Sequence, residues 1–171
     1  RVLFRSIRDV RGQYRAKLMT PTEAVATIES HSQIIQPLGA GEPPALLAAV
    51  AETVKAGRLE NITMHAMLPL NNTAKTVLQP QLTDEIKWRS YFFSGFDRRA
   101  YQEGRATYVP NLFHQAPRIF SEFDQIDTAI AAVSPMDRHG CFNLGVSVDY
   151  TLAACRSAKR LIVEVNPNMP R

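Results

Sequence analysis

Two kinds of segment follow each other along the chain: short apolar runs, and segments that carry helix-start or helix-stop signals. The apolar runs predict strands at 34–38, 61–67, 126–133 and 161–165, with further extended segments at 88–93 and 106–109. Helices are expected at 20–28, 43–55, 97–102 and 152–159. Strands that alternate with helices predict a layered α/β domain with a largely parallel sheet.

Local signals support several of these elements. Thr20, Pro21 and Glu23 provide a helix cap, a proline at the first helical position and a capping box. Segment 126–133 is predominantly apolar without alternation, which is typical of a strand buried on both faces, and 161–165 is expected to be a second buried strand.

Length and composition indicate a soluble folded protein. The chain has 171 residues, which suits one domain or a piece of a larger protein, and 45% of them are hydrophobic and 21% charged. The longest apolar run, 45–51, is far shorter than a membrane helix requires, and the first residues do not resemble a signal peptide. Cys141 and Cys155 form no metal or disulfide pattern, so we expect reduced thiols in a cytoplasmic protein.

Basic residues are concentrated in the first 17 positions and account for much of the net charge of +4. They are Arg1, Arg5, Arg8, Arg11, Arg15 and Lys17. These residues can bind an acidic partner, such as the phosphates of a nucleotide cofactor, but a solvated helix face is the favoured interpretation. Nucleic acid is not an expected partner, because the basic residues are neither clustered further on nor interleaved with aromatic residues.

Three loops that follow predicted strands are the candidate ligand contacts, because open α/β sheets bind ligands at the carboxyl ends of their strands. They are Gly39–Pro44, Ser134–Gly140 and Asn166–Arg171. In the first loop, glycines allow a close backbone approach, and the following helix is expected to offer free N–H groups to a phosphate or thioester oxygen. A tight strand-to-helix turn without ligand remains an alternative.

Other chemistries fit poorly. Asp137 and His139 can form an acid/base pair, but with no nucleophile in view a structural role is favoured for both. Pro44 replaces the last glycine of a dinucleotide-binding pattern, and no Walker motif or G-x-S-x-G elbow occurs. No metal site is expected, since His65 and His114 lie far apart without ligands at suitable spacing. The residues themselves indicate a ligand-binding α/β domain.

Three strings taken together resemble the acetyl-CoA hydrolase/transferase family. They are Gly39-Ala40-Gly41-Glu42-Pro43-Pro44-Ala45-Leu46-Leu47, Ser134-Pro135-Met136-Asp137-Arg138-His139-Gly140 followed by Leu144-Gly145, and Val163-Glu164-Val165-Asn166-Pro167-Asn168-Met169-Pro170-Arg171. They occur in the family's order, and the resemblance extends over most of the chain from Tyr14. Ser30-His31-Ser32 departs from the family, which usually has a glycine and an acidic residue there.

The resemblance implies a three-layer α/β/α fold of the CoA-transferase type, with residues 1–171 as the N-terminal domain of a two-domain subunit. It implies transfer of coenzyme A from an acyl-CoA to a small carboxylic acid through a glutamyl-CoA intermediate. The attacking glutamate belongs to the C-terminal domain, so no catalytic residue is expected in this chain, and Glu42, Glu103 and Glu164 do not inherit that role. The CoA thioester is a substrate, and no permanently bound cofactor is expected.

The candidate substrate contacts are Gly39, Ala40, Gly41, Met136, His139 and Asn166. The C-terminal domain and further copies of the protein are the expected partners, and a missing second domain predicts exposed apolar surface on one face. Two alternatives stay open: an acyl-CoA hydrolase, and a non-catalytic fragment or subunit that only pairs with a catalytic half. A sugar-phosphate isomerase of the same general fold would need an acid/base constellation that is not found.

Overall fold

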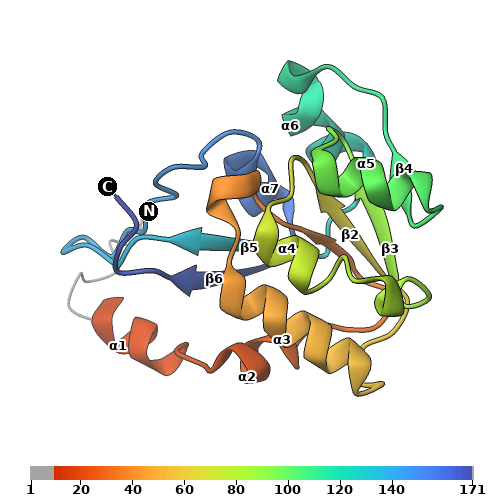
Figure 1. Cartoon of the computed structure of the whole chain (residues 1–171). Coiled ribbons are helices and arrows are strands. Elements are labelled where there is room, and N and C mark those ends of the chain that lie inside the picture. Colours follow the sequence, from red (N-terminus) through yellow and green to blue (C-terminus); the bar gives the residue numbers. More distant parts are fainter. Residues whose placement is uncertain (1–9, 171) are drawn as a thin grey trace.

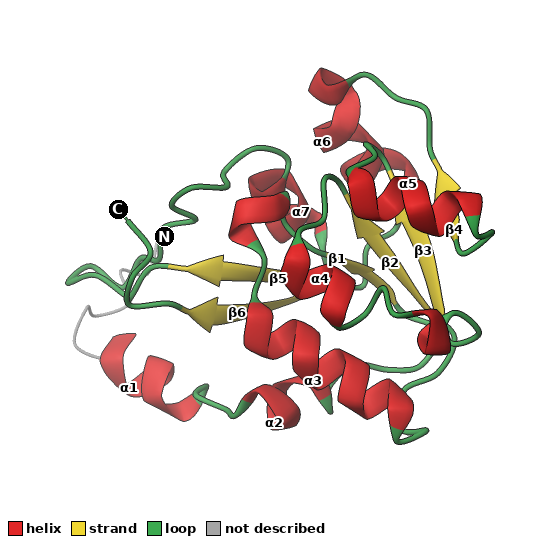
Figure 2. Ribbon diagram, in the orientation of Figure 1, coloured by secondary structure: helices red, strands yellow, loops and turns green. Residues whose placement is uncertain are grey.

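A computed structural model describes residues 10–170, so the predicted roles of Arg1, Arg5, Arg8 and Arg171 lie outside the described residues. Its centre is one sheet of six parallel strands in the order β4-β3-β2-β1-β5-β6 (Figures 1 and 2). The strands are β1 Gln33–Ile35, β2 Ile62–Ala66, β3 Ile86–Ser90, β4 Ala106–Tyr108, β5 Thr128–Val133 and β6 Arg160–Val165.

Helices cover both faces of this sheet. They are α1 Val10–Ala16, α2 Pro21–Val25, α3 Pro44–Lys55, α4 Asn71–Lys75, α5 Gly95–Gln102, α6 Ala116–Arg118 and α7 Thr151–Ser157. Shorter helical turns are Gly39–Gly41, Pro80–Leu82, Phe113–Gln115 and Ile119–Phe123.

Two hydrophobic cores show that the fold has three layers. On β1, Ile34 belongs to the core shared with α2, α3 and α5, whereas its neighbour Ile35 belongs to the core shared with α6 and α7. Successive side chains of a strand point to opposite faces, so a single strand contributes to both cores. The predicted three-layer α/β/α fold with a parallel sheet is confirmed.

Most predicted elements occur, with shifted ends. The capping box forms as expected, since Glu23 N–H donates to Thr20 Oγ1 and Thr20 N–H to the Glu23 carboxylate. The first predicted helix ends at Val25, before residue 28. The first predicted strand ends at Ile35, since Pro37 has no N–H group for a further ladder bond. The two turns of α6 and Ile119–Phe123, within 110–125, were not predicted.

The last strand differs from its prediction. β5 is buried along its whole length, as expected, but β6 forms the edge of the sheet, and Leu161 is 49% exposed. A strand with a neighbour on one side only cannot bury both faces as completely as a central strand, so the prediction of a second fully buried strand is wrong.

The basic N-terminal segment is described only from residue 10. Arg11 and Arg15 are exposed on α1, and Lys17 is exposed just after it. This arrangement is that of a solvated helix face, the favoured interpretation of the sequence. Within residues 10–170, every helix is too short or too polar to cross a membrane.

Candidate functional site

The strand order reverses direction at β1. From β1 the chain proceeds to β2, β3 and β4 on one side, whereas β5 and β6 lie on the other side. The crevice at the carboxyl ends of β1 and β5 is therefore the topological switch point, where sheets of this kind bind ligands. The three loops predicted as ligand contacts follow β1, β5 and β6, which are adjacent strands, so all three begin at the same edge of the sheet.

The turn Gly39–Gly41 follows β1 at this edge. The N–H groups of Gly41 and Glu42 donate within the turn, to Leu38 O and Gly39 O, whereas the N–H of exposed Ala40 finds no acceptor within residues 10–170. The N–H of Gly39 likewise finds no acceptor there, so the turn holds two unpaired main-chain donors at the switch point, of which only the one on Ala40 belongs to an exposed residue.

Contacts inside the protein leave no room for a side chain on Gly41 and little room for one on Gly39. A Cβ on Gly41 would lie 2.6 Å from Ser147 Cβ and 2.8 Å from Pro37 Cβ. A Cβ on Gly39 would lie 3.0 Å from Leu68 O. The sequence suggests that these positions are glycine so that a ligand can approach. The structure offers a second reason, because the protein itself fills the space beside both residues.

The start of α3 was expected to offer free N–H groups, and for two residues this expectation is wrong. Ala45 N–H and Leu46 N–H donate to Glu164 Oε2 at 2.9 and 3.0 Å. Glu164 lies within β6, as predicted, and its carboxylate caps the positive end of the α3 dipole. An anion at this point would have to displace a carboxylate of the protein.

Glu42 is buried and fixes the glycine turn to the segment that follows β2. Its Oε1 accepts hydrogen bonds from Leu70 N–H at 2.6 Å and Thr73 Oγ1 at 2.7 Å. Thr73 Oγ1 in turn accepts one from Gln36 Nε2 at 2.8 Å, and Gln36 is buried just after β1. The sequence does not predict this network, because its members are far apart along the chain.

The segment after β5 is joined to the segment after β1 by hydrogen bonds from two side chains. Ser147 Oγ donates to Leu38 O at 3.1 Å, and Tyr150 Oη donates to Gln36 O at 2.8 Å. Gln36 Oε1 is buried and is the one buried side-chain polar atom within residues 10–170 without a hydrogen-bond partner. These hydrogen bonds hold the two segments together at the switch point.

The loop 134–140 contains the predicted residues Met136 and His139. Asp137 Oδ1 accepts hydrogen bonds from His139 N–H and Cys141 N–H, both at 2.8 Å, so Asp137 caps the turn, as the structural interpretation predicted. The His139 ring is exposed and accepts a hydrogen bond from Arg138 Nε at 3.0 Å. Met136 is half-buried beside this turn.

Asn166 follows β6 and lies next to the end of β5, since its N–H donates to Val133 O at 2.8 Å. The segment beyond it packs against the β5 loop. Met169 is buried, and its Sδ lies 2.4 Å from the position that a Cβ on Gly145 would take. The second and third strings of the sequence resemblance therefore meet in space.

A buried polar cluster on the α6–α7 side of the sheet was not foreseen. His65 Nδ1 and the Tyr91 hydroxyl are hydrogen-bonded at 2.7 Å, and the same hydroxyl donates to Asp124 Oδ2 at 2.5 Å. Arg89 pairs with the other oxygen of Asp124 at 2.9 Å. Burial lowers the pKa of His65 to about 4, although Asp124 acts in the opposite direction, and burial raises the pKa of Tyr91.

Among residues 10–170, no three His, Cys, Asp or Glu side chains gather closely enough to hold a metal ion. Cys141 is exposed and Cys155 half-buried, and both are free thiols. Burial raises the pKa of Cys155 to about 11, so this sulfur is a poor nucleophile at neutral pH.

Comparison with known proteins gives a consistent result. Residues 5–171 match the acetyl-CoA hydrolase/transferase N-terminal domain. The chain is 34% identical over 164 residues to the succinyl-CoA:cyclohexane-1-carboxylate CoA transferase of Geobacter metallireducens, covering 96% of this chain and 36% of that protein. It is 36% identical over 160 residues to the 4-hydroxybutyrate coenzyme A transferase of Clostridium kluyveri, covering 92% of this chain and 36% of the relative.

The solved structure of RipA from Yersinia pestis superposes with a TM-score of 0.89 at 42% identity, covering 95% of this chain and 39% of RipA. The chain thus spans little more than a third of the length of the relatives that it matches.

Proposed function

The chain belongs to the acetyl-CoA hydrolase/transferase family and matches its N-terminal domain, and on this basis we propose that it forms the N-terminal part of a CoA-transferase. The complete enzyme moves coenzyme A from an acyl-CoA to a small carboxylic acid. The named relatives that transfer CoA between carboxylic acids support this reaction class. The CoA thioester is a substrate of the enzyme and not a resident cofactor.

The observation that supports the proposal most is the position of the turn Gly39–Gly41. It lies at the switch point of the sheet, fixed by buried Glu42 and by Ser147, and presents the N–H of Ala40 to solvent. A main-chain N–H fixed in this way can donate to an oxygen that gains negative charge when a thioester carbonyl is attacked. Met136, His139 and Asn166 are proposed to line the cleft beside it.

The nucleophile is proposed to be a glutamate outside this chain. Its carboxylate attacks the thioester carbonyl, and the CoA thiolate leaves as an acyl-glutamyl anhydride forms. The thiolate then attacks the glutamyl carbonyl, which gives glutamyl-CoA and releases the first carboxylic acid. The acceptor carboxylate repeats both steps in the opposite direction. Glu42 and Glu164 are not proposed for the first step, because one oxygen of each is engaged by main-chain N–H groups of the same domain.

The test begins with the intact mass of the natural protein, compared with the 19.1 kDa of this chain. The natural protein and residues 1–171 are then each incubated with acetyl-, butyryl- or succinyl-CoA without an acceptor acid. The expected result is a covalent CoA adduct only where the second domain is present, and CoA transfer once acetate is added. An adduct on residues 1–171 alone would contradict the proposal. Release of free CoA without transfer would identify a hydrolase.

A further inference from the structure

One buried hydroxyl joins the two ends of the loop between β1 and α3, which is called loop 36–42 below. Thr73 Oγ1 accepts a hydrogen bond from Gln36 Nε2 at 2.8 Å, at the start of the loop. It donates to Glu42 Oε1 at 2.7 Å, at the end of the loop. Gln36 and Glu42 are buried too. Both ends of the loop are therefore held by a single side chain of another element, α4.

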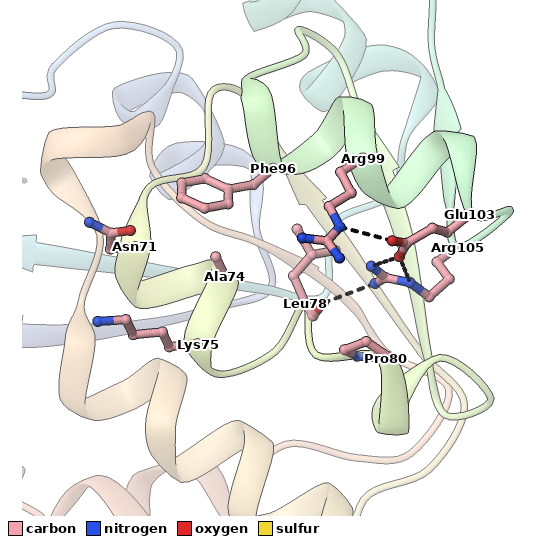
Figure 3. A pocket seen from close by; sticks show the side chains of 9 residues that line it. All are labelled: Asn71, Ala74, Lys75, Leu78, Pro80, Phe96, Arg99, Glu103 and Arg105. Carbon is pink, nitrogen blue, oxygen red and sulfur yellow. Dashed lines mark hydrogen bonds and ion pairs between the residues drawn. The ribbon is translucent and has the colours of Figure 1, made fainter.

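Thr73 differs from the other residues of its helix. Asn71, Ala74 and Lys75 line a groove between α4 and α5 (Figure 3), whereas Thr73 does not line it and is completely buried. Removing the Thr73 hydroxyl therefore changes the contact with loop 36–42 and leaves the outer surface of α4 as it is.

The direction of each hydrogen bond follows from the groups present. A carboxylate only accepts, so the Thr73 hydroxyl gives its one hydrogen to Glu42 and accepts from Gln36. The amide nitrogen of Gln36 thus faces Thr73, and Gln36 Oε1 is left buried without a partner within residues 10–170. An apolar side chain of similar size would avoid the cost of this unpaired oxygen. We therefore assign the role of Gln36 to its hydrogen bond with Thr73.

Ala40 lies inside this loop, and its unpaired N–H is the donor at the switch point. A donor to a developing oxyanion has to be in place before the reaction, because a displacement of about 1 Å can reduce the rate about 100-fold. Ser147 Oγ holds the loop from the β5 side through Leu38 O, and Thr73 holds it from α4. Together the two attachments restrict the movement of the Ala40 N–H.

We propose that Thr73 is a positioning residue for CoA transfer: its hydroxyl joins Gln36 to Glu42 and so holds the Ala40 N–H in place for the thioester oxygen. This role rests on the proposed function, because that function places the thioester beside the turn. Thr73 is completely buried and acts only through the loop. Its loss should therefore slow the reaction more than it weakens acyl-CoA binding.

The test compares Thr73→Val, which removes the hydroxyl and keeps the branched shape, with Thr73→Ser, which keeps the hydroxyl. Thr53→Val is the matched control, because Thr53 is a buried threonine of α3 whose hydroxyl donates to Ala49 O and not to the loop. Gln36→Met removes the other partner. The kcat and KM for transfer from butyryl- or succinyl-CoA to acetate are measured in the natural protein, together with amide hydrogen exchange of loop 36–42 and the urea midpoint.

Thr73→Val is expected to lower kcat at least tenfold, with the KM for the acyl-CoA within about threefold, and to speed hydrogen exchange in loop 36–42. Thr73→Ser should stay within about twofold of the unmutated protein in kcat, and so should Thr53→Val. Gln36→Met should lower kcat without lowering the urea midpoint, because it also removes the unpaired oxygen.

Equal kcat in Thr73→Val and Thr73→Ser would overturn the positioning role. An equal loss in Thr53→Val, or a higher KM at unchanged kcat in Thr73→Val, would overturn it too. Absence of transfer by the unmutated protein would instead count against the proposed function. Hydrogen exchange then still decides whether Thr73 holds the loop, since equal exchange of loop 36–42 in the valine and serine variants would show that it does not.

Discussion

The Nδ1 atom of His65 lies 2.7 Å from the hydroxyl of Tyr91, and both side chains are buried between the sheet and the α6–α7 layer. On its other side, His65 Nε2 lies 2.7 Å from Gln33 Oε1. The Phe120 ring packs edge-on against both aromatic neighbours. A titratable ring held in this way makes the stability of the domain dependent on pH.

Stability is expected to fall as the pH is lowered from about 6.5 toward 4. Burial lowers the pKa of His65 to about 4 in the folded state, against an ordinary value of 6.5. Between those values the unfolded chain binds the proton and the folded chain does not, so acid favours unfolding, by up to about 3 kcal/mol. The stabilisation is fully present above pH 6.5. Urea unfolding at pH 7.5, 6.5, 5.5 and 4.5 measures this loss.

Two variants test whether His65 causes the loss of stability at low pH. His65→Asn should be less stable at pH 7.5 and should show a smaller decline toward pH 4.5 than the natural chain. His139→Gln replaces an exposed histidine and should leave the decline unchanged. An identical decline in His65→Asn and the natural chain would assign the pH dependence to groups other than His65.

Replacing Glu42 by alanine is expected to destabilise the domain by about 1–3 kcal/mol, because it leaves the Leu70 N–H and the hydroxyl of buried Thr73 without this acceptor. Glu42→Gln keeps one acceptor oxygen and should lose less. Glu52→Ala is the control, since Glu52 pairs with Lys55 on the surface and should cost less than about 1 kcal/mol. Equal losses for Glu42→Ala and Glu52→Ala, measured by urea unfolding, would show that the buried network contributes no stability.

The sequence predicts the strands and the edge of the sheet at which the candidate loops gather, because apolar runs and turn residues are local signals. It does not predict the partners of the buried polar groups. Glu42 binds Thr73, 31 residues further on, and His65 binds Tyr91 and Gln33, 26 and 32 residues away. Only the folded sheet brings these positions together. For the same reason the sequence does not reveal why a position is glycine. Gly41 could be glycine to let a ligand approach, but the structure shows that Ser147 leaves no room for a side chain there.

Gly41→Ala is expected to destabilise the domain by about 1–3 kcal/mol, because the new methyl group would overlap Ser147 and Pro37. Gly95→Ala is the matched control. A Cβ on Gly95, at the start of α5, meets nothing within 4 Å, so alanine there should be neutral or slightly stabilising. Thermal unfolding of both variants measures the difference. If Gly41→Ala proved as stable as Gly95→Ala, the turn would be adaptable enough to move around a ligand.

Glu164→Ala is expected to cost about 1 kcal/mol, because it removes the acceptor for Ala45 and Leu46 and the negative charge at the positive end of α3. Glu164→Gln should lose less, since an amide oxygen still accepts. In the proposed two-domain enzyme, Glu164→Gln should transfer CoA at a rate within about twofold of the unmutated protein, because helix capping requires an acceptor and not a nucleophile. Loss of the covalent CoA adduct in this variant would instead place Glu164 in the chemistry.

His31 has a φ of 65°, in the left-handed region that favours glycine, while its N–H donates to Glu60 O at 2.9 Å. Replacement by glycine should relieve about 1–2 kcal/mol of backbone strain and cost about 0.5–1 kcal/mol in chain entropy, so His31→Gly should be modestly more stable than the natural chain.

His31→Ala keeps the strain and should be no more stable than the natural chain, whereas asparagine tolerates this conformation better and should lie between alanine and glycine. Urea unfolding at pH 7.5 gives this order directly. If His31→Gly were less stable than His31→Ala, the entropy cost of glycine in the unfolded chain would exceed the backbone strain that glycine relieves.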